Sequence, residues 1–595
     1  MLREALRRDA DEILAGRWLA FGHLGLKVDD PPKWHCDYLV GRDLETQESA
    51  FTLDHRALPG GADIKLIWEL SRWTHLTRLA MAAYVLGDQR AAEKCLAWLE
   101  DWVKHNPPYR GWNWTSALES GLRLIQFTWI DALLGGNAEC GMQNAELEDQ
   151  LTRLRRAILP PHVWFTWRHR SFGSSANNHL LGELAGLITA TVRWPELNRL
   201  CTSLDNLQGR WAGEVMKQFA ADGGDREQAL NYHLFSWELC WQTFRALHGV
   251  QRQAGGVEER LAAAARFFWE AQARTDHWDY GDSDNAAVVP FYARAEQAVA
   301  EWHRWFEAPA KSQALGYWMG NSPSWLPLLR NGPPVKAEER GEWWLFRQSG
   351  LAVCESGFWW LRWDLSPLGY LATAAHGHLD ALHLAIWRKG VALVVDPGTG
   401  AYYGNLALRT WLASRTAHNA PCPEGVDAPQ RLGPFLWSRH HLAPQFGTAG
   451  RAAEGVSRLL SGVIERRIER LEMEDGWSII DSYAPRFPEH GRAFTVRWQF
   501  APDTVVKQLG ERRFIIKRQG IEMEVQVSAD WSDVDLVEMD SLTAQPDNFE
   551  GIVSPAFRKT LRAPFLKLTA RPTAQPCVFS TRFLACGPSI PADRA

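Results

Sequence analysis

The chain has 595 residues, of which 46% are hydrophobic and 23% charged. These ordinary values for a globular protein exclude a disordered, collagenous or fibrous chain. Its 65 lysines and arginines are balanced by 70 aspartates and glutamates, so the net charge of −5 provides no global basic field for nucleic acid or membranes. We therefore expect neither nucleic acid nor a membrane as a partner.

The beginning of the chain, residues 1–14, has the pattern of an amphipathic helix and lacks the apolar core of a signal peptide. No apolar run approaches the roughly 20 residues that span a bilayer, so the sequence predicts a soluble chain. The nine cysteines include no CxxC pair and therefore indicate neither a disulfide framework nor a thiolate zinc site. The 32 tryptophans are unusually many. We expect most of them in helix-packing cores, although their flat faces also suit sugar rings.

In the first half, apolar residues recur at helical spacing, in stripes that include Leu66, Leu118 and Leu180. Turn-forming pairs such as Gly87-Asp88 and Pro160-Pro161 separate the stripes and predict helices joined by short loops. Short loops make neighbouring helices antiparallel. Because no fixed-period repeat is present, a toroid of helical hairpins or a stacked helical repeat fits better than a simple solenoid.

In the second half, the hydrophobic period becomes that of β-strands. Lys389-Gly390 and Asp475-Gly476 each stand between two strand-like segments, which predicts β-hairpins. Further strand-like segments follow at 494–500, 513–517 and 521–527. The sequence thus predicts an α+β multidomain chain, with a helical domain at 1–322, a linker at 323–342 and antiparallel β-sheets packed on one another at 343–595.

Two patches in the helical half contain more polar and ionisable side chains than packing requires. The first is Asn177-Asn178-His179 before an apolar helix, where capping explains one asparagine but hardly the whole cluster. The second begins at the Gly223-Gly224 turn and places Tyr232 near the start of a helix. A buried ring with a hydrated hydroxyl would be the ordinary explanation for this tyrosine.

Two further patches lie in the β half. His378, Asp396 and His418 come from separate segments, and two imidazoles with a carboxylate can form a three-ligand zinc site with a fourth position for water. For an arbitrary set of this kind, ordinary core or surface groups are the commoner explanation, so the assignment depends on the resemblance described next. The last patch is Tyr402-Tyr403, followed by Arg409.

Taken in order, these motifs are Asn-Asn-His, Gly-Gly-Asp-x-Glu-Gln-x-x-x-Tyr-His, His-x-His-x-Asp, Asp-Pro-Gly-Thr and Thr-x-His-Asn. As an ordered set they resemble the heparinase II/III family of polysaccharide lyases, which also includes oligoalginate lyases. Segments 63–72 and 111–123 extend the resemblance over most of the chain. The resemblance implies an incomplete (α/α) toroid followed by an antiparallel β-sandwich, in agreement with the pattern of helices and strands.

The resemblance also implies β-elimination on a uronate, in which the C5 proton is removed, the 4-O leaving group is protonated and a 4,5-unsaturated sugar is released. It assigns Asn178, with His179 beside it and Asn177 as the alternate, to neutralising the carboxylate, and Tyr232 to proton transfer. His376 is the candidate partner of Tyr232, either as a base or in carboxylate binding. Tyr403, or less favourably Tyr402, matches a second catalytic tyrosine. Which group is the base and which the acid stays open, because that depends on uronate stereochemistry.

Substrate binding is expected at residues that suit an acidic sugar, with salt bridges and core packing as the alternative explanation. The candidates are Asn177, the aromatic residues Trp112 and Trp114, and the charged residues Arg72, Glu119, Arg123 and Arg409. The resemblance further implies Zn²⁺ at His378, Asp396 and His418, mainly as a structural ion, and no organic cofactor.

The expected partner is an anionic polysaccharide or oligosaccharide, such as heparan sulfate, hyaluronate, alginate or a bacterial exopolysaccharide. A homodimer is left open, and so is a cytoplasmic location beside the periplasmic or secreted one that the resemblance implies. Two alternatives remain. One is an (α/α)-toroid glycoside hydrolase with Asp282, Asp284 or Glu227 as its carboxylates. The other is a non-catalytic carbohydrate-binding protein.

Overall fold

The computed structural model describes residues 2–135, 145–254, 256–273, 275–288, 338–340, 342–370, 374–425, 429–449, 452–486, 493–538, 548–571 and 578–586. The chain divides into two compact units. The helical unit comprises Met1–Phe219, Leu234–Arg266 and Asn285–Pro333, and the sheet unit comprises Ala220–His233, Phe267–Asp284 and Pro334–Ala595. The predicted linker lies outside the described residues, except for 338–340 and 342.

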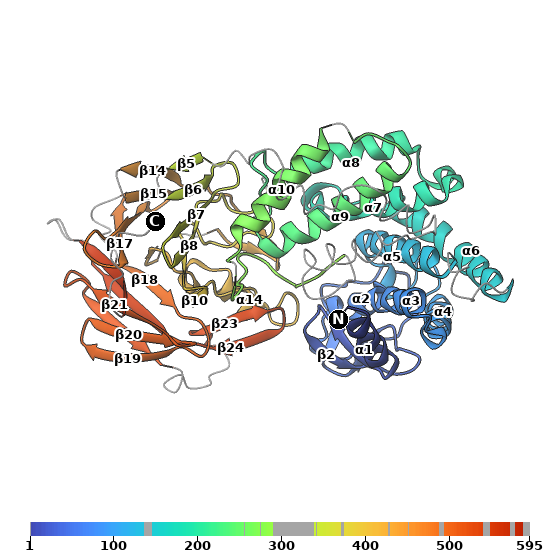
Figure 1. The fold of residues 1–595 in the computed structure, drawn as a ribbon, viewed down its shortest axis with the longest axis horizontal. Helices are drawn as coiled ribbons and strands as arrows, with labels where there is room; N and C mark the ends of the chain where they lie inside the picture. Colours follow the sequence, from blue (N-terminus) through green and yellow to red (C-terminus); the bar gives the residue numbers. More distant parts are fainter. Residues whose placement is uncertain are drawn as a thin grey trace. The chain divides into compact units, whose positions relative to one another are not determined.

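Helices occupy most of the described first half of the chain (Figure 1). They are α1 (Leu2–Leu14), α2 (Ile64–Ser71), α3 (Thr74–Leu86), α4 (Gln89–His105), α5 (Ala117–Gly135), α6 (Ala145–Arg168), α7 (Asn178–Arg193), α8 (Leu204–Gln218), α9 (Leu230–Gly249) and α10 (Val257–Ala271). The helix predicted at 1–14 is confirmed. Among the described residues, no helix has the length and apolar character needed to cross a membrane.

Helix α5 lies at the centre of the helical unit and packs against α3, α6 and α7. It is buried on every side from Ala117 to Leu134, which is typical of an inner helix. Near the end of α5, Asp131 pairs with Arg193 at the end of α7, so these two helices run in parallel. Helix α6 runs the opposite way, because Thr166 near its end donates a hydrogen bond to Ser120 near the start of α5. The starts of α5 and α7 and the end of α6 therefore lie at one end of the unit.

The prediction that Pro160-Pro161 separates two helices is wrong, because α6 continues through both prolines. Two prolines remove the backbone donors for the carbonyl groups four residues earlier, which belong to Arg156 and Ala157. Both of these residues are exposed, so water can hydrogen-bond the two carbonyls. The buried side chains on the opposite face of α6 keep the helix intact across this point.

The sheet unit contains three large antiparallel sheets. A six-stranded sheet has the order β10-β9-β8-β7-β6-β5 and is formed by β5 (Glu338–Arg340), β6 (Trp343–Phe346), β7 (Leu351–Ser356), β8 (Trp359–Asp364), β9 (Leu384–Arg388) and β10 (Val391–Val394). An eight-stranded sheet has the order β14-β15-β16-β17-β26-β21-β20-β19. Its strands are β14 (Gln445–Ala449), β15 (Ala452–Leu459), β16 (Gly462–Arg470), β17 (Gly476–Pro485), β19 (Val505–Gly510), β20 (Arg513–Arg518), β21 (Ile521–Val527) and β26 (Phe579–Ala585).

A four-stranded sheet has the order β11-β18-β25-β22 and contains β11 (Cys422–Pro423), β18 (Phe494–Gln499), β22 (Asp533–Val537) and β25 (Phe565–Ala570). The hairpins predicted at Lys389-Gly390 and Asp475-Gly476 are confirmed as β9–β10 and β16–β17. One apolar core joins the three sheets, and it includes Trp363 and Trp477. This packing of sheets on a shared core is the arrangement that the strand pattern predicts.

Candidate active site and metal centre

The Asn177-Asn178-His179 motif lies at the start of α7 in the helical unit. Asn177 is the residue before the helix, and its side-chain oxygen accepts a hydrogen bond of 3.3 Å from the His179 N–H. Asn178 is the first helical residue and is 1% exposed. Helix capping therefore explains one asparagine of the motif, Asn177, as predicted. The amide of Asn178 lies in the first turn of the helix and is not explained by capping.

The segment that holds Tyr232 belongs to the sheet unit and is held within it by Asp222. Its Oδ2 accepts hydrogen bonds from the backbone N–H groups of Gln348 at 2.7 Å and Ser349 at 3.2 Å, and its Oδ1 accepts from the Ser349 hydroxyl. Gly224 approaches Ser349 so closely that a Cβ at this position would overlap the serine side chain. The chain then enters α9, where Tyr232 lies in the first turn.

Tyr232 lies against His376, with ring centroids 4.2 Å apart, and both are nearly fully buried. His376 has a φ of +63°, a left-handed conformation that costs energy for a residue with a side chain. Each of its ring nitrogens faces a carboxylate: Nδ1 is 3.0 Å from Asp282 Oδ2, and Nε2 is 3.4 Å from Glu227 Oε2. The imidazole is therefore fixed in orientation between two acids and beside a phenol.

Asp282 connects His376 to the predicted metal ligands. Its second oxygen, Oδ1, lies 2.8 Å from His378 Nε2 and also accepts from the Arg409 guanidinium. Burial alone would raise the pKa of Asp282, but Arg409 and the two histidines outweigh burial and hold this pKa well below its usual range. Asp282 is thus an ionised acid whose two oxygens are both engaged.

The pKa of Tyr232 is raised well above its ordinary value, first by burial and then by the negative charges of Asp284 and Asp282. The neighbouring Tyr402 hydroxyl opposes this shift. Tyr402 is fully buried, whereas Tyr403 is half-buried and packs its ring on Phe435 at 5.8 Å. Of the two neighbouring tyrosines, the geometry favours Tyr402 as the partner of Tyr232.

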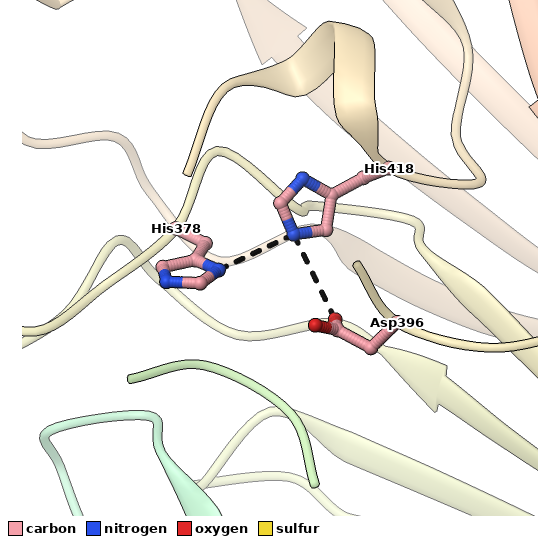
Figure 2. A group of neighbouring side chains, drawn as sticks. All are labelled: His378, Asp396 and His418. Atoms are coloured by element: carbon pink, nitrogen blue, oxygen red, sulfur yellow. Dashed lines mark hydrogen bonds and ion pairs between the residues drawn. The ribbon is translucent and has the colours of Figure 1, made fainter. Parts of the chain in front are cut away.

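The side chains of His378, Asp396 and His418 converge from three segments of the sheet unit (Figure 2). All three are buried, and their candidate ligand atoms lie within 4.8 Å of one another. Nδ1 of His378 is 3.3 Å from Nε2 of His418. Two ligand atoms bonded at about 2.0–2.1 Å to a tetrahedral ion lie roughly 3.3–3.4 Å apart, so the spacing of these two nitrogens suits a shared metal ion.

The hydrogen bonds of the two histidines leave the right nitrogens for a metal. His418 Nδ1 lies 2.7 Å from the Ser414 carbonyl oxygen, so it carries the proton and Nε2 has the lone pair. In His378, Nε2 lies 2.8 Å from the acceptor-only carboxylate of Asp282 and 3.1 Å from the donor-only guanidinium of Arg409. The shorter contact, with Asp282, favours the proton on Nε2 and the lone pair on Nδ1. Oδ2 of Asp396 accepts no hydrogen bond from any described residue. Two facing lone pairs and an unsatisfied carboxylate oxygen are the donor set that a cation satisfies.

The charged substrate-binding candidates of the helical unit form a buried network. Glu119 accepts two hydrogen bonds from Arg72, at 2.8 and 2.7 Å, and both side chains are at most 2% exposed. Arg123 donates to His162 and to the Asn113 carbonyl, and burial lowers its pKa to about 9. These contacts match the alternative explanation of salt bridges and core packing, and sugar binding at these positions stays a prediction.

The remaining substrate-binding candidates are also engaged within the protein. Trp112 is 9% exposed, Trp114 is 1% exposed, and Arg409 is fully buried. Arg409 donates to Asp282 and, through Nε, to the Pro434 carbonyl at 3.0 Å. In this structure Arg409 orients Asp282, and a direct contact with the substrate stays a prediction.

Sequence reasoning did not assign Asp282 or Glu227 to the lyase site and named them only for the hydrolase alternative. A usable signal was present in Gly281-Asp282-Ser283-Asp284, where small polar residues follow an aromatic stretch. Because both oxygens of Asp282 are engaged by histidines and Arg409, this residue has the surroundings of an orienting group rather than of a hydrolase acid or nucleophile.

Comparison with known proteins agrees with this arrangement of motifs. The heparinase II/III N-terminus model matches residues 45–255, and the heparinase II/III-like C-terminal model matches residues 339–580. The chain belongs to the heparinase II/III family. No curated protein sequence matches it.

Solved structures support the fold at low sequence identity. Heparan sulfate lyase HepC from Pedobacter heparinus, in a mutant form, is 15% identical with a TM-score of 0.57, over 98% of this chain and 84% of that one. A heparinase III structure is 13% identical with a TM-score of 0.63, over 98% of this chain and 89% of that one. The predicted fold class, an incomplete (α/α) toroid followed by an antiparallel β-sandwich, is confirmed.

Proposed function

We propose that this protein is a polysaccharide lyase that cleaves an anionic, uronate-containing glycan by β-elimination. The observation that supports the proposal most directly is the buried cluster of Tyr232, His376 and Asp282, in which a phenol and an oriented imidazole lie side by side. The family membership and the lyase titles of its structural neighbours point to the same chemistry.

In this proposal Tyr232 protonates the leaving oxygen. Its raised pKa keeps the phenol protonated at neutral pH, which suits a proton donor better than a base. The leaving 4-O develops negative charge as its bond to the neighbouring sugar breaks. A phenol that is still protonated at this point can transfer its proton to the leaving oxygen.

His376 supplies the second group of the reaction. Because Asp282 accepts from Nδ1, the lone pair of the neutral ring is on Nε2, which lies 3.4 Å from Glu227, and we assign this nitrogen to the C5 proton; in the protonated ring Nε2 would instead donate to the uronate carboxylate. A positive charge that develops on this ring would face Asp282 and Glu227, and both carboxylates would stabilise it. The amide of Asn178 is the proposed neutralising donor for the uronate carboxylate, because it can donate without carrying a titratable proton.

We assign Zn²⁺ to the His378, Asp396 and His418 site. Two imidazole nitrogens and one carboxylate oxygen are a common zinc donor set, and the two nitrogens have a tetrahedral spacing. The ion would tie together the three segments that hold these residues, and it would be mainly structural. Asp282 would then act as the shared hydrogen-bond acceptor of the ligand His378 and of His376.

One screen tests the proposal. The purified protein is incubated with heparan sulfate, hyaluronate, chondroitin and alginate, and the absorbance of the conjugated double bond in the products is followed. Elimination generates this signal, whereas hydrolysis adds water and generates none. We expect absorbance to rise with at least one polymer, and Tyr232→Phe to reduce the rate by roughly 10²-fold or more.

Tyr483→Phe provides the matched control, because Tyr483 is a buried tyrosine of β17 whose hydroxyl donates to the Ser461 carbonyl. Its removal should leave the rate within about twofold, as one neutral hydrogen bond contributes only to stability. New reducing ends without absorbance would support the glycoside hydrolase alternative instead. Binding without any cleavage would support a carbohydrate-binding protein.

A further inference from the structure

A cluster of aromatic side chains is partly exposed on the helical unit. We call it the aromatic platform and define it as Phe51, Tyr109, Trp164, Phe165 and His169. The ring centroids of Phe51 and His169 are 4.9 Å apart, those of Tyr109 and Trp164 5.0 Å, and those of Phe165 and His169 4.8 Å. Phe51 is 57% exposed and Trp164 is 37% exposed. Grouped exposed rings of this kind mark binding sites more often than solitary ones.

The platform is built on a rigid base. Tyr109 has a φ of +66°, and its carbonyl accepts a hydrogen bond of 2.9 Å from the Ala50 N–H, which fixes the chain beside Phe51. Trp114 lies beneath, with its ring 5.3 Å from Tyr109 and 5.4 Å from Phe165, and is 1% exposed. The rings are therefore ordered before any ligand arrives, which reduces the entropy cost of binding. Backbone strain at Tyr109 is consistent with a site that is held for function.

The platform lies at the end of the helical unit where the proposed neutralising amide lies. Trp164 and Phe165 belong to the last part of α6, and that end of α6 is beside the starts of α5 and α7. Asn178 is the first residue of α7, and only segment 170–177 separates it in the chain from His169. Ser171 within this segment is fixed by two hydrogen bonds to Glu183 of α7, at 2.7 and 2.6 Å.

Basic residues accompany the rings. Arg110 follows Tyr109 in the sequence, Arg168 precedes His169, and both arginines are exposed. Arg170 follows His169 and lies with its guanidinium 3.3 Å from the centroid of the Trp167 ring. Flat apolar faces beside guanidinium groups suit a ligand that presents both C–H surfaces and carboxylate or sulfate groups.

We propose that the aromatic platform is a binding subsite for sugar residues of the acidic polysaccharide that lie beyond the cleaved bond. The C–H faces of successive pyranose rings pack on Phe51, Tyr109 and Trp164, while the arginines pair with the acidic groups of the same chain. The inference rests on the proposed function for the identity of the ligand class. It adds that long chains bind more tightly than short ones because they reach this surface.

Binding is tested without cleavage by affinity electrophoresis in native gels that contain heparan sulfate, hyaluronate, alginate or neutral dextran. We expect the wild-type protein to be retarded by at least one acidic polymer and not by dextran. The double variant Phe51→Ala/Trp164→Ala should be retarded less, with an apparent dissociation constant for the polymer about tenfold higher, as expected when two exposed anchors are truncated. Phe358→Ala/Trp344→Ala is the matched control, since Phe358 is 49% and Trp344 43% exposed on the sheet unit.

Kinetics provide a second measurement on a polymer that the protein cleaves. For the Phe51→Ala/Trp164→Ala variant we expect the KM for the polymer to rise about tenfold, with kcat within about twofold. For the shortest oligosaccharide that is still cleaved, KM should be unchanged because such a substrate does not reach the platform. Circular dichroism and the thermal midpoint identify a variant that fails to fold, and Arg168→Ala then provides a milder test of the same surface.

The two proposals fail in different ways. If no polymer is cleaved but the platform variant alone loses retardation, the lyase proposal is wrong and the platform is confirmed. If a polymer is cleaved and both retardation and KM are the same in the platform variant and the wild type, the platform is wrong and the lyase proposal stands. Absence of retardation of the wild-type protein in every gel would also overturn the platform.

Discussion

Nδ1 of His378 lies 3.3 Å from Nε2 of His418. The bond from His418 Nδ1 to the Ser414 carbonyl leaves a lone pair on His418 Nε2, and the short contact of His378 Nε2 with Asp282, closer than the one with Arg409, favours a lone pair on His378 Nδ1 as well. Such a pair repels unless a cation lies between the nitrogens. The unsatisfied Oδ2 of Asp396, 3.7 Å from His418 Nε2, completes the donor set. The packing of this part of the sheet unit is therefore expected to depend on a bound ion.

We predict one zinc ion per chain, measured by inductively coupled plasma mass spectrometry, and its loss in Asp396→Asn and His418→Gln. Removal by a chelator should lower the thermal midpoint by roughly 5–10 °C, as a loss of a few kcal/mol does in a large domain. His440→Gln serves as the control, because this imidazole lies outside the cluster. A metal content near zero in freshly purified wild-type protein, with no response to added zinc, would contradict the assignment.

The second prediction concerns Asp282, which hydrogen-bonds both His376 and the candidate metal ligand His378. Asp282→Asn keeps the size of the side chain but removes its charge and one of its two acceptors. We expect kcat to fall by roughly 10²-fold with little change in KM, because the imidazole loses its orientation rather than its contact with substrate.

Asp279→Asn is the matched control. Asp279 is an acid three positions before Asp282, and among the described residues its carboxylate accepts a hydrogen bond from the Ser283 hydroxyl. This variant should keep kcat within about threefold. Zinc content measured on the same samples separates two effects: a loss of kcat with full zinc supports orientation of His376. If kcat falls only in proportion to lost zinc, Asp282 acts on the metal site alone.

Local patterns predict the secondary structure well where each element follows its own periodicity. The hairpin turns at Lys389-Gly390 and Asp475-Gly476 and the helix at the beginning of the chain depend on neighbouring residues, and the structure contains all three. The two prolines of α6 were expected to end a helix, but the helix continues through them. The local rule that proline breaks helices does not take into account that water can hydrogen-bond the carbonyl groups that lose their partners.

The candidate site was predictable only in part, and the reason is physical. His378, Asp396 and His418 lie in motifs of the ordered set that resembles the heparinase II/III family, so the resemblance grouped them as candidate ligands, and the structure brings them together. The role of Asp282 depends on hydrogen bonds to residues nearly a hundred positions later in the chain, which no spacing rule reveals. The buried state of Arg409 likewise follows from tertiary packing, which converts a candidate for substrate binding into a partner of Asp282.

The third prediction is a pH dependence of stability at Glu183. Burial raises the pKa of this carboxyl to about 8, although hydrogen bonds from Ser171 oppose the shift. A carboxyl whose pKa is higher in the folded than in the unfolded state stabilises the fold fully below its unfolded pKa of about 4.3. That stabilisation is lost as the pH rises through the folded pKa.

Thermal midpoints measured from pH 4 to pH 9 therefore separate wild type from Glu183→Gln. The amide in this variant cannot ionise, so the difference in stability between the two proteins should shift in favour of the variant by up to a few kcal/mol across this range. Other titrating groups are common to both proteins and cancel in the difference. A difference that stays constant with pH would show that Glu183 has an ordinary pKa in the folded protein.

The last prediction concerns Gly224, which lets the segment carrying Tyr232 pack closely against Ser349 within the sheet unit. A Cβ at this position would overlap the side chain of Ser349 and lie 2.9 Å from the Phe267 ring. Gly224→Ala should therefore displace the hydrogen bonds of Asp222 and destabilise the protein by about 1–3 kcal/mol, as overpacking does. Because Tyr232 belongs to the same segment, kcat should fall as well.

Gly213→Ala is the matched control, because Gly213 lies within α8 and a Cβ there would meet nothing within 4 Å. In an open helical position alanine is favoured by about 0.5–1 kcal/mol, so this control should be slightly more stable than the wild type. Adding Ser349→Gly to Gly224→Ala removes the serine atoms that overlap, while the Phe267 ring stays at 2.9 Å and Asp222 loses the Ser349 hydroxyl, so partial recovery of kcat in the double variant would attribute part of the loss to the Ser349 contact. If Gly224→Ala alone retains both full stability and full activity, close approach at this point does not position Tyr232.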